Sequence, residues 1–183
     1  MVKLQDEFDV VVDWRGFELH PETPRGGMSV ASFFPGESRR EEFRNYMQQF
    51  AANHGVPMGQ PSHIPNTRRA LAMTEYAREN GKLEQFRDAT MAAHWFDGKD
   101  IEADNDLAAL AKNVGLDPVA ALKAADDRTY LDRVDAIRAE AQEYGVTSIP
   151  TFFLGSDDHV VVGCQPYESI RKRAQIAGLK RVG

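Results

Sequence analysis

The chain opens with an alternation of apolar and polar positions that is typical of a β-strand. Phe8, Val10, Val12 and Trp14 occupy every second position. A period of two places alternate side chains on opposite faces of an extended backbone, so we predict a strand over residues 8–15. The segment that follows is rich in proline and glycine, which predicts a loop.

The middle of the chain changes to the period of an amphipathic helix. From Phe43 to Phe50, apolar residues recur at i, i+3, i+4 and i+7, and similar patterns follow. Glycines after the periodic runs mark where helices end, and Asp117-Pro118 marks where one begins. The predicted helices lie over 37–54, from the cap residue Asn66 to Asn80-Gly81, over 83–95, over 107–114, from Pro118 onward and over 130–144.

Two short apolar runs near the C-terminus predict a β-hairpin. The runs 151–154 and 159–162 flank Gly-Ser-Asp-Asp, a sequence that favours a turn, and a last helix follows Pro166. The order of strand, helices, hairpin and helix predicts an α/β fold in which helices cover a sheet. We expect a single domain over 1–183, with the helices of about 37–144 as an insertion.

Composition narrows the function classes. The chain has 183 residues and a formal net charge of −6, which disfavours nucleic acid as a partner. No apolar run is long enough for a membrane span, and the N-terminal residues lack the apolar core of a signal peptide. The single cysteine, Cys164, excludes an internal disulfide and fits a reducing compartment, so we expect a cytoplasmic protein. The histidines lack metal-ligand spacing, and Asp157-Asp158-His159 fits a turn better than a metal site.

Four segments together resemble one known family in its own order. These are "WRGFELHPETP" (14–24), "NTRRALAMTEYARENGK" (66–82), "DGKDIEADNDLAALAKNVGLD" (97–117) and "GVTSIPTFFLGSDDHVVVGCQP" (145–166). The chain resembles the DsbA-like thioredoxin-fold proteins, in the branch of FrnE-type oxidoreductases and 2-hydroxychromene-2-carboxylate isomerases. The resemblance implies a thioredoxin-like fold with a helical insertion.

The resemblance also implies a binding site around a cis-proline loop. In such proteins the backbone of this loop pairs with an extended peptide or with glutathione. The residues that the resemblance assigns to binding are Ser148, Ile149, Pro150, Thr151, Trp14 and Asn66. It implies no cofactor other than glutathione, and protein thiols, protein disulfides or glutathione as partners.

The chain departs from the family at its start. The family begins with a strand and a helix whose N-terminus carries Cys-x-x-Cys or a serine-bearing equivalent, whereas "LQDEF" (4–8) resembles the tail of that helix. We therefore expect the first strand and most of the first helix to be missing, and no catalytic residue to be present. The missing strand would leave open edges, which we expect to be filled by pairing of 8–15 with 151–154 or by a second copy in a homodimer.

Cys164 is the one candidate reactive thiol. It precedes a helix N-terminus, which favours a thiolate, but a free cysteine at a strand end is more often a small buried residue. We favour the buried interpretation. A single thiol can form a mixed disulfide, but it cannot cycle as a dithiol pair.

Three functions remain open from the sequence. The first is a member of the thiol–disulfide oxidoreductase lineage that is truncated or redox-inactive as written. The second is a glutathione-dependent isomerase of the 2-hydroxychromene-2-carboxylate isomerase type. The third is a non-catalytic peptide-binding module.

Overall fold

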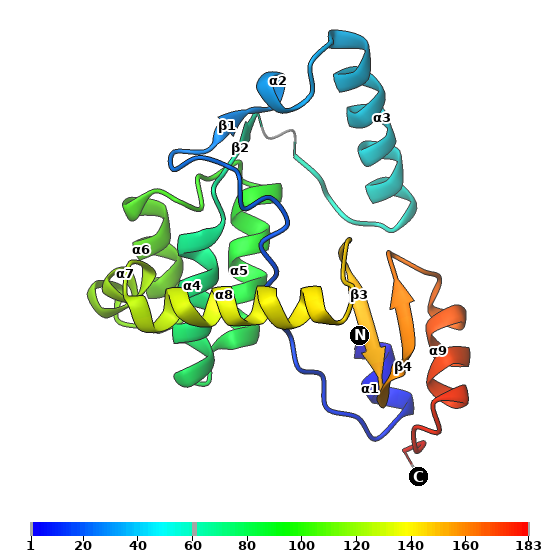
Figure 1. Cartoon of the computed structure of the whole chain (residues 1–183). Coiled ribbons are helices and arrows are strands. Elements are labelled where there is room, and N and C mark those ends of the chain that lie inside the picture. Colours follow the sequence, from blue (N-terminus) through cyan, green and yellow to red (C-terminus); the bar gives the residue numbers. More distant parts are fainter. Residues whose placement is uncertain (1, 60–61, 183) are drawn as a thin grey trace. The chain divides into compact units, whose positions relative to one another are not determined.

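The chain forms two compact units, which we describe separately. The computed structural model describes residues 2–59 and 62–182. One unit contains residues 1–19 and 136–183, and the other contains residues 20–135. In chain order the elements are α1 (Val2–Glu7), β1 (Met28–Ser29), α2 (Val30–Phe33), α3 (Glu37–Asn53), β2 (His63–Ile64), α4 (Arg68–Glu79), α5 (Leu83–Trp95), α6 (Asp104–Asn113), α7 (Pro118–Ala125), α8 (Arg128–Glu143), β3 (Thr151–Leu154), β4 (Ser156–Val162) and α9 (Tyr167–Ile176) (Figure 1).

The unit formed by the two chain ends is built on the antiparallel β3–β4 hairpin. Thr151 pairs with Val162 and Phe153 with Val160, and the register shifts between Phe153 and Leu154. The hairpin was predicted, but β4 begins at Ser156, three residues before the expected start, and only Gly155 separates it from β3. One face of the hairpin packs against α1 and α9. The buried residues of this core are Leu4, Phe8, Leu154, Val161 and Ala174.

The strand predicted over 8–15 is wrong. Residues 9–18 have no regular secondary structure among the described residues, and Phe8 forms only an isolated antiparallel bridge with Arg181. The alternation still shows in the burial, since Val11 is 96% exposed while Val10 packs against the core. The alternation shows which side chains share an apolar face of an extended segment. A β-strand also needs a neighbouring strand that forms hydrogen bonds with its backbone N–H and C=O groups. The expected pairing of 8–15 with 151–154 is therefore not formed.

The second unit has a helical core. Its helices α4 to α7 were all predicted, and their ends follow local chemistry. The Asp117 carboxylate, for example, accepts a 2.7 Å hydrogen bond from the Ala120 N–H and so caps α7. The core side chains include Met73, Ala77, Phe86, Leu107 and Ala121, each 0% exposed. The two-stranded sheet β1–β2 was not predicted, because each strand has only two residues.

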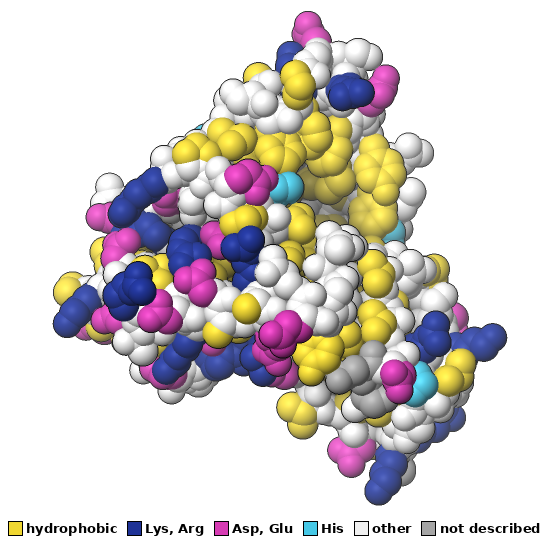
Figure 2. Space-filling view, in the orientation of Figure 1, with side chains coloured by type: hydrophobic (Ala, Val, Ile, Leu, Met, Phe, Trp, Pro, Cys, Tyr) yellow, Lys and Arg dark blue, Asp and Glu magenta, His cyan; other side chains and the backbone are white. Residues whose placement is uncertain are grey.

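Helix α3 forms where the sequence predicts it, but its apolar face is uncovered. Of its 17 residues only Ala51 is buried, whereas Phe43 and Tyr46 are 43% and 63% exposed. Hydrophobic side chains gather over this helix on the face seen in Figure 2. The helical spacing of the apolar residues correctly predicts the helix. It does not show whether another element covers the apolar face of that helix.

In the part of the chain that the structure describes, no helix has the length and apolar character to cross a membrane.

The core of the second unit gives a stability prediction. Replacing Phe86, which is 0% exposed, by alanine should lower the free energy of unfolding by about 3–5 kcal/mol, because it removes buried apolar surface and leaves a cavity. The matched control is Phe96→Ala just beyond the end of the same helix, where the side chain is 45% exposed and the loss should stay below about 1 kcal/mol. Urea denaturation followed by circular dichroism measures both. Equal losses would contradict the assignment of Phe86 to the core.

Candidate functional site

Residues 144–150 connect α8 to β3 and are called the proline loop. Contacts at both ends of this loop fix its conformation. Gly145, at a φ of 70°, ends α8, and the Ile149–Pro150 peptide bond is cis. The Thr151 hydroxyl donates to the Ser148 carbonyl at 2.7 Å, which closes the loop on itself. The Gly163 N–H donates to the Pro150 carbonyl at 2.8 Å, which ties the loop to the end of β4. Four of the predicted binding residues, 148–151, thus form one continuous, hydrogen-bonded segment.

The hydrogen bond between the Gly163 N–H and the Pro150 carbonyl shows which backbone groups of β3 point toward β4 and which point away from it. Because the Pro150 carbonyl points to β4, the alternation of an antiparallel ladder turns the N–H and C=O of Phe152 to β4 as well. The N–H and C=O of Thr151 and Phe153 then point to the opposite edge. Within the described residues β3 has β4 as its only neighbouring strand, so this edge is open. An open edge is a template for an added strand.

Cys164 is exposed. The prediction from the sequence that this cysteine is a small buried residue at a strand end is therefore wrong. Gly163, at a φ of 78°, turns the chain out of β4, so Cys164 falls in the connection to α9 and not on the core face of the strand. Its neighbour Gly163 is the residue that bonds Pro150. Cys164 is therefore one residue away from a direct contact with the proline loop.

The other two predicted binding residues lie outside this loop. Trp14 belongs to the irregular segment after α1 and is partly exposed. Asn66 belongs to the other unit, where its side-chain amide donates to the Thr23 carbonyl at 2.7 Å and accepts from the Arg68 N–H at 3.0 Å. These bonds give Asn66 a local role at the start of α4. A role of Trp14 or Asn66 in ligand binding stays a prediction.

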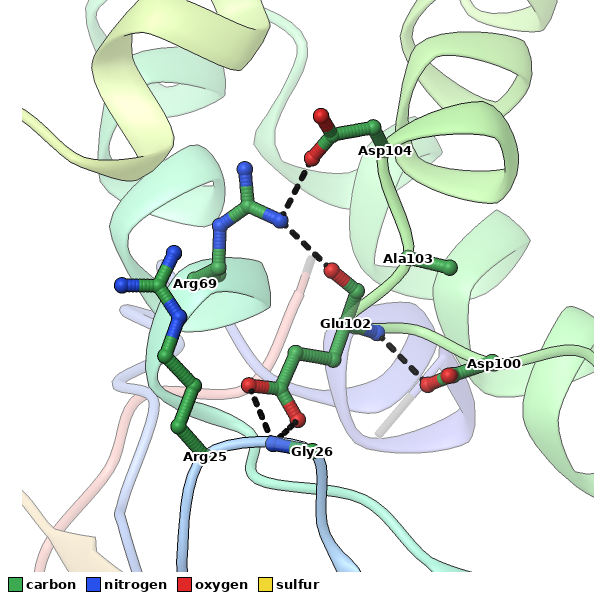
Figure 3. A pocket seen from close by; sticks show the side chains of 7 residues that line it. All are labelled: Arg25, Gly26, Arg69, Asp100, Glu102, Ala103 and Asp104. Carbon is green, nitrogen blue, oxygen red and sulfur yellow. Dashed lines mark hydrogen bonds and ion pairs between the residues drawn. The ribbon is translucent and has the colours of Figure 1, made fainter.

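The second unit holds a charged pocket of about 280 Å³ that sequence reasoning missed (Figure 3). The Arg69 guanidinium donates to the Glu102 carbonyl at 2.6 Å and pairs with Asp104 at 2.7 Å and Asp126 at 2.9 Å. The buried Glu102 carboxylate accepts the Gly26 N–H at 3.0 Å. Burial by itself lowers the pKa of Arg69, but the hydrogen bonds that its guanidinium donates to Asp104 and Asp126, together with the charges of these carboxylates, outweigh burial, so the pKa is raised.

These contacts give the pocket a structural role. They connect α4, the loop before α6 and the end of α7, and the acid groups are already engaged by Arg69 and the backbone. The members come from segments far apart in the sequence, and no spacing motif relates them. No pattern in the sequence could have revealed the pocket.

The comparisons with known proteins identify the family. A family model described as a DSBA-like thioredoxin domain matches residues 1–175. The chain belongs to this family. The predicted resemblance and the predicted mixed, thioredoxin-like fold class are thereby confirmed, with helices predominating over small sheets.

Three individual proteins illustrate the similarity. The Bacillus subtilis protein YwbO, itself uncharacterized, is 28% identical over 158 residues, covering 85% of this chain and 76% of YwbO. A probable DsbA oxidoreductase from Streptomyces coelicolor has a TM-score of 0.79 at 25% identity, over 90% of this chain and 74% of that one. A 2-hydroxychromene-2-carboxylate isomerase has a TM-score of 0.71 at 19% identity, over 96% of this chain and 83% of the isomerase, which is a likeness of fold alone.

The exposure of Cys164 can be tested directly. We expect Ellman's reagent to titrate one thiol per chain in the native state, at a rate within about tenfold of that in guanidinium chloride, because access to the exposed thiol needs no unfolding. The Cys164→Ser variant serves as the blank. Labelling that occurs only after denaturation would contradict the placement of this residue.

Proposed function

We propose that this chain binds an extended polypeptide by β-strand addition at the proline loop and the outer edge of β3. The observation that carries the proposal is the bond from the Gly163 N–H to the Pro150 carbonyl, which directs the Thr151 N–H and C=O outward. Main-chain hydrogen bonds supply affinity in this mode of recognition, and neighbouring side chains supply specificity. Membership of the DSBA-like family supports a peptide that carries a thiol or a disulfide.

The thiol chemistry that these residues support is limited to one exchange. The Cys164 thiolate attacks one sulfur of a partner disulfide, a new disulfide joins the two chains, and the other partner sulfur leaves as a thiolate. A second protein thiol is needed to resolve this mixed disulfide, and the sequence contains one cysteine. We therefore propose that these 183 residues bind and exchange but do not turn over as a dithiol oxidoreductase. A reducing compartment such as the cytoplasm fits this use of a single thiol.

Two alternatives from the sequence remain proposals of lower rank. Glutathione is itself a short extended thiol peptide, so a glutathione-dependent isomerase would use the same loop. A second copy of the chain is a candidate donor of the added strand, which would make a homodimer. The experiment below separates the glutathione alternative from peptide binding.

The experiment compares two substitutions at Thr151. The probe is a fluorescein-labelled seven-residue peptide that alternates phenylalanine and alanine between terminal lysines, and binding is followed by fluorescence anisotropy. Thr151→Pro removes the outward N–H without removing a bond to β4, so affinity should fall about tenfold, as for the loss of roughly one hydrogen bond. The matched control Thr151→Val keeps the N–H and loses only the hydroxyl bond to Ser148, so its affinity should stay within about threefold of the wild type.

Three results would contradict the proposal. One is no binding of the peptide by the wild type. The second is equal affinity of Thr151→Pro and the wild type. The third is calorimetric binding of reduced glutathione, with the seven-residue peptide unable to compete, which would favour the isomerase alternative.

A further inference from the structure

We infer that acid releases an arm of the second unit, because two histidines at the base of this arm, His63 and His94, both gain a positive charge. The arm consists of residues 28–54, which form β1, α2 and α3. This inference is independent of the proposed function, since the arm belongs to the second unit, whereas the proline loop and Cys164 belong to the other unit. Release of the arm would make the placement of α3, with its uncovered apolar face, depend on pH.

The arm is joined to the rest of its unit by a short base. Each strand of the β1–β2 sheet has two residues, and Ser29 of β1 pairs with His63 of β2. The Val30 N–H adds a hydrogen bond to the Ser62 carbonyl at 3.0 Å. Beyond this base, Ala51 is the one buried residue among the 17 of α3. A base this short opens when a few hydrogen bonds break, so the arm can move without unfolding of the helical core.

His63 lies against the backbone that leads into the arm. A Cβ on Gly27, just before β1, would collide with the His63 Nε2 atom and with the Ile64 carbonyl. Gly27 also has a φ of 67°, a conformation that favours glycine. The chain therefore passes the imidazole at a distance that leaves no room for a side chain. A change in the charge of His63 acts directly on this backbone.

His94 lies at the other side of the base, in the last turn of α5. Its ring packs edge-on against Trp95, with the ring centroids 4.8 Å apart. The Trp95 carbonyl accepts the Gly59 N–H at 2.6 Å, which joins this end of α5 to the segment between α3 and β2. The histidine thus sits beside a hydrogen bond that holds the returning chain of the arm.

The surroundings of His94 favour its neutral form. Burial lowers the pKa of His94 most strongly, and the charge of His63 lowers it further. A backbone hydrogen bond with Lys99 and the charge of Asp100, both in the loop after α5, raise the pKa but do not outweigh burial. The ammonium group of Lys99 is itself paired with Asp106 at 3.8 Å. The net result is a pKa below the ordinary value for histidine.

Acid favours the open base because the open base binds more protons. When the base opens, water reaches the His94 ring and its pKa returns toward the ordinary value of about 6.5. The closed base is therefore fully favoured above this pH and loses stability as the pH falls below it. Once both histidines are protonated, two positive charges lie at the base and repel each other, and the single carboxylate of Asp100 offsets one of them.

Amide hydrogen exchange followed by two-dimensional NMR tests this inference. Exchange is measured at about pH 8 and about pH 5, on either side of the ordinary histidine pKa, and each rate is divided by the intrinsic rate at that pH. We expect the protection of the Val30 and Gly59 N–H groups to be about tenfold lower at the acidic pH. The Phe86 N–H, which donates to the Lys82 carbonyl in the helical core, should keep its protection.

Three variants assign the effect to the histidines. His94→Gln keeps a side-chain N–H donor and gains no charge, so the protection of Val30 and Gly59 should be equal at both pH values. His63→Gln removes the second charge and should make the loss of protection smaller. The matched control is His54→Gln, which changes an exposed histidine at the end of α3 and should leave the tenfold loss as it is in the wild type.

The outcomes separate release of the arm from other effects of acid. Equal protection of Val30 and Gly59 at both pH values in the wild type would overturn the inference. So would a tenfold loss that persists in His94→Gln, or an equal loss at Phe86, which would mean that the helical core unfolds. If His94→Gln lowers the protection already at the higher pH, His63→Gln decides: a smaller loss in that variant supports the inference, and an unchanged loss overturns it.

Discussion

The hydrogen bond from the Gly163 N–H to the Pro150 carbonyl is the contact on which the rest of the site depends. At 2.8 Å it joins the proline loop to the end of β4 and fixes the register of the hairpin. A slip of one residue would turn Phe153 toward the core and bring Phe152 to the exposed face of the hairpin, since side chains alternate with a period of two. The same slip would exchange the backbone groups that face outward. One bond therefore determines both the backbone edge and the side-chain surface of the candidate site.

The core of the unit with the two chain ends maintains this register. Leu154 and Val161 are buried against Leu4, Phe8 and Ala174, so the hairpin gains apolar burial only when these faces point inward. On the opposite face of the hairpin, the described residues do not bury the side chains to the same extent, and Phe153 and Val162 stay partly exposed. The second unit has a helical core of its own, and its Arg69–Glu102 contacts stabilise loops within that unit.

Much of the fold was predictable because local chemistry specifies it. The helix cap at Asp117 and the hairpin over 151–162 follow from short sequence signals, and the structure contains both. Ser148–Thr151 also form the continuous loop that the family resemblance implies. These features need only neighbours in the sequence, or a family pattern, to be recognised.

The features that sequence reasoning missed depend on partners distant in the sequence. The alternation over 8–15 predicts a strand, but the only bridge that this segment makes with other described residues is between Phe8 and Arg181. The sequence favours a buried strand end for Cys164, but the turn at Gly163 places this exposed residue outside β4. The contact between Tyr144 and Phe153 crosses a loop whose path the sequence does not give. In each case the sequence indicates side-chain character, and tertiary structure decides what that side chain contacts.

Amide hydrogen exchange of β3 measures the open edge directly. We expect fast exchange for the Thr151 and Phe153 N–H groups and slower exchange for the Phe152 N–H, which faces β4. Saturation with the seven-residue peptide of alternating phenylalanine and alanine should slow the exchange of the Thr151 and Phe153 N–H groups while changing that of Phe152 little. Protection of Thr151 and Phe153 in the free protein, or no change on peptide binding, would contradict strand addition at this edge.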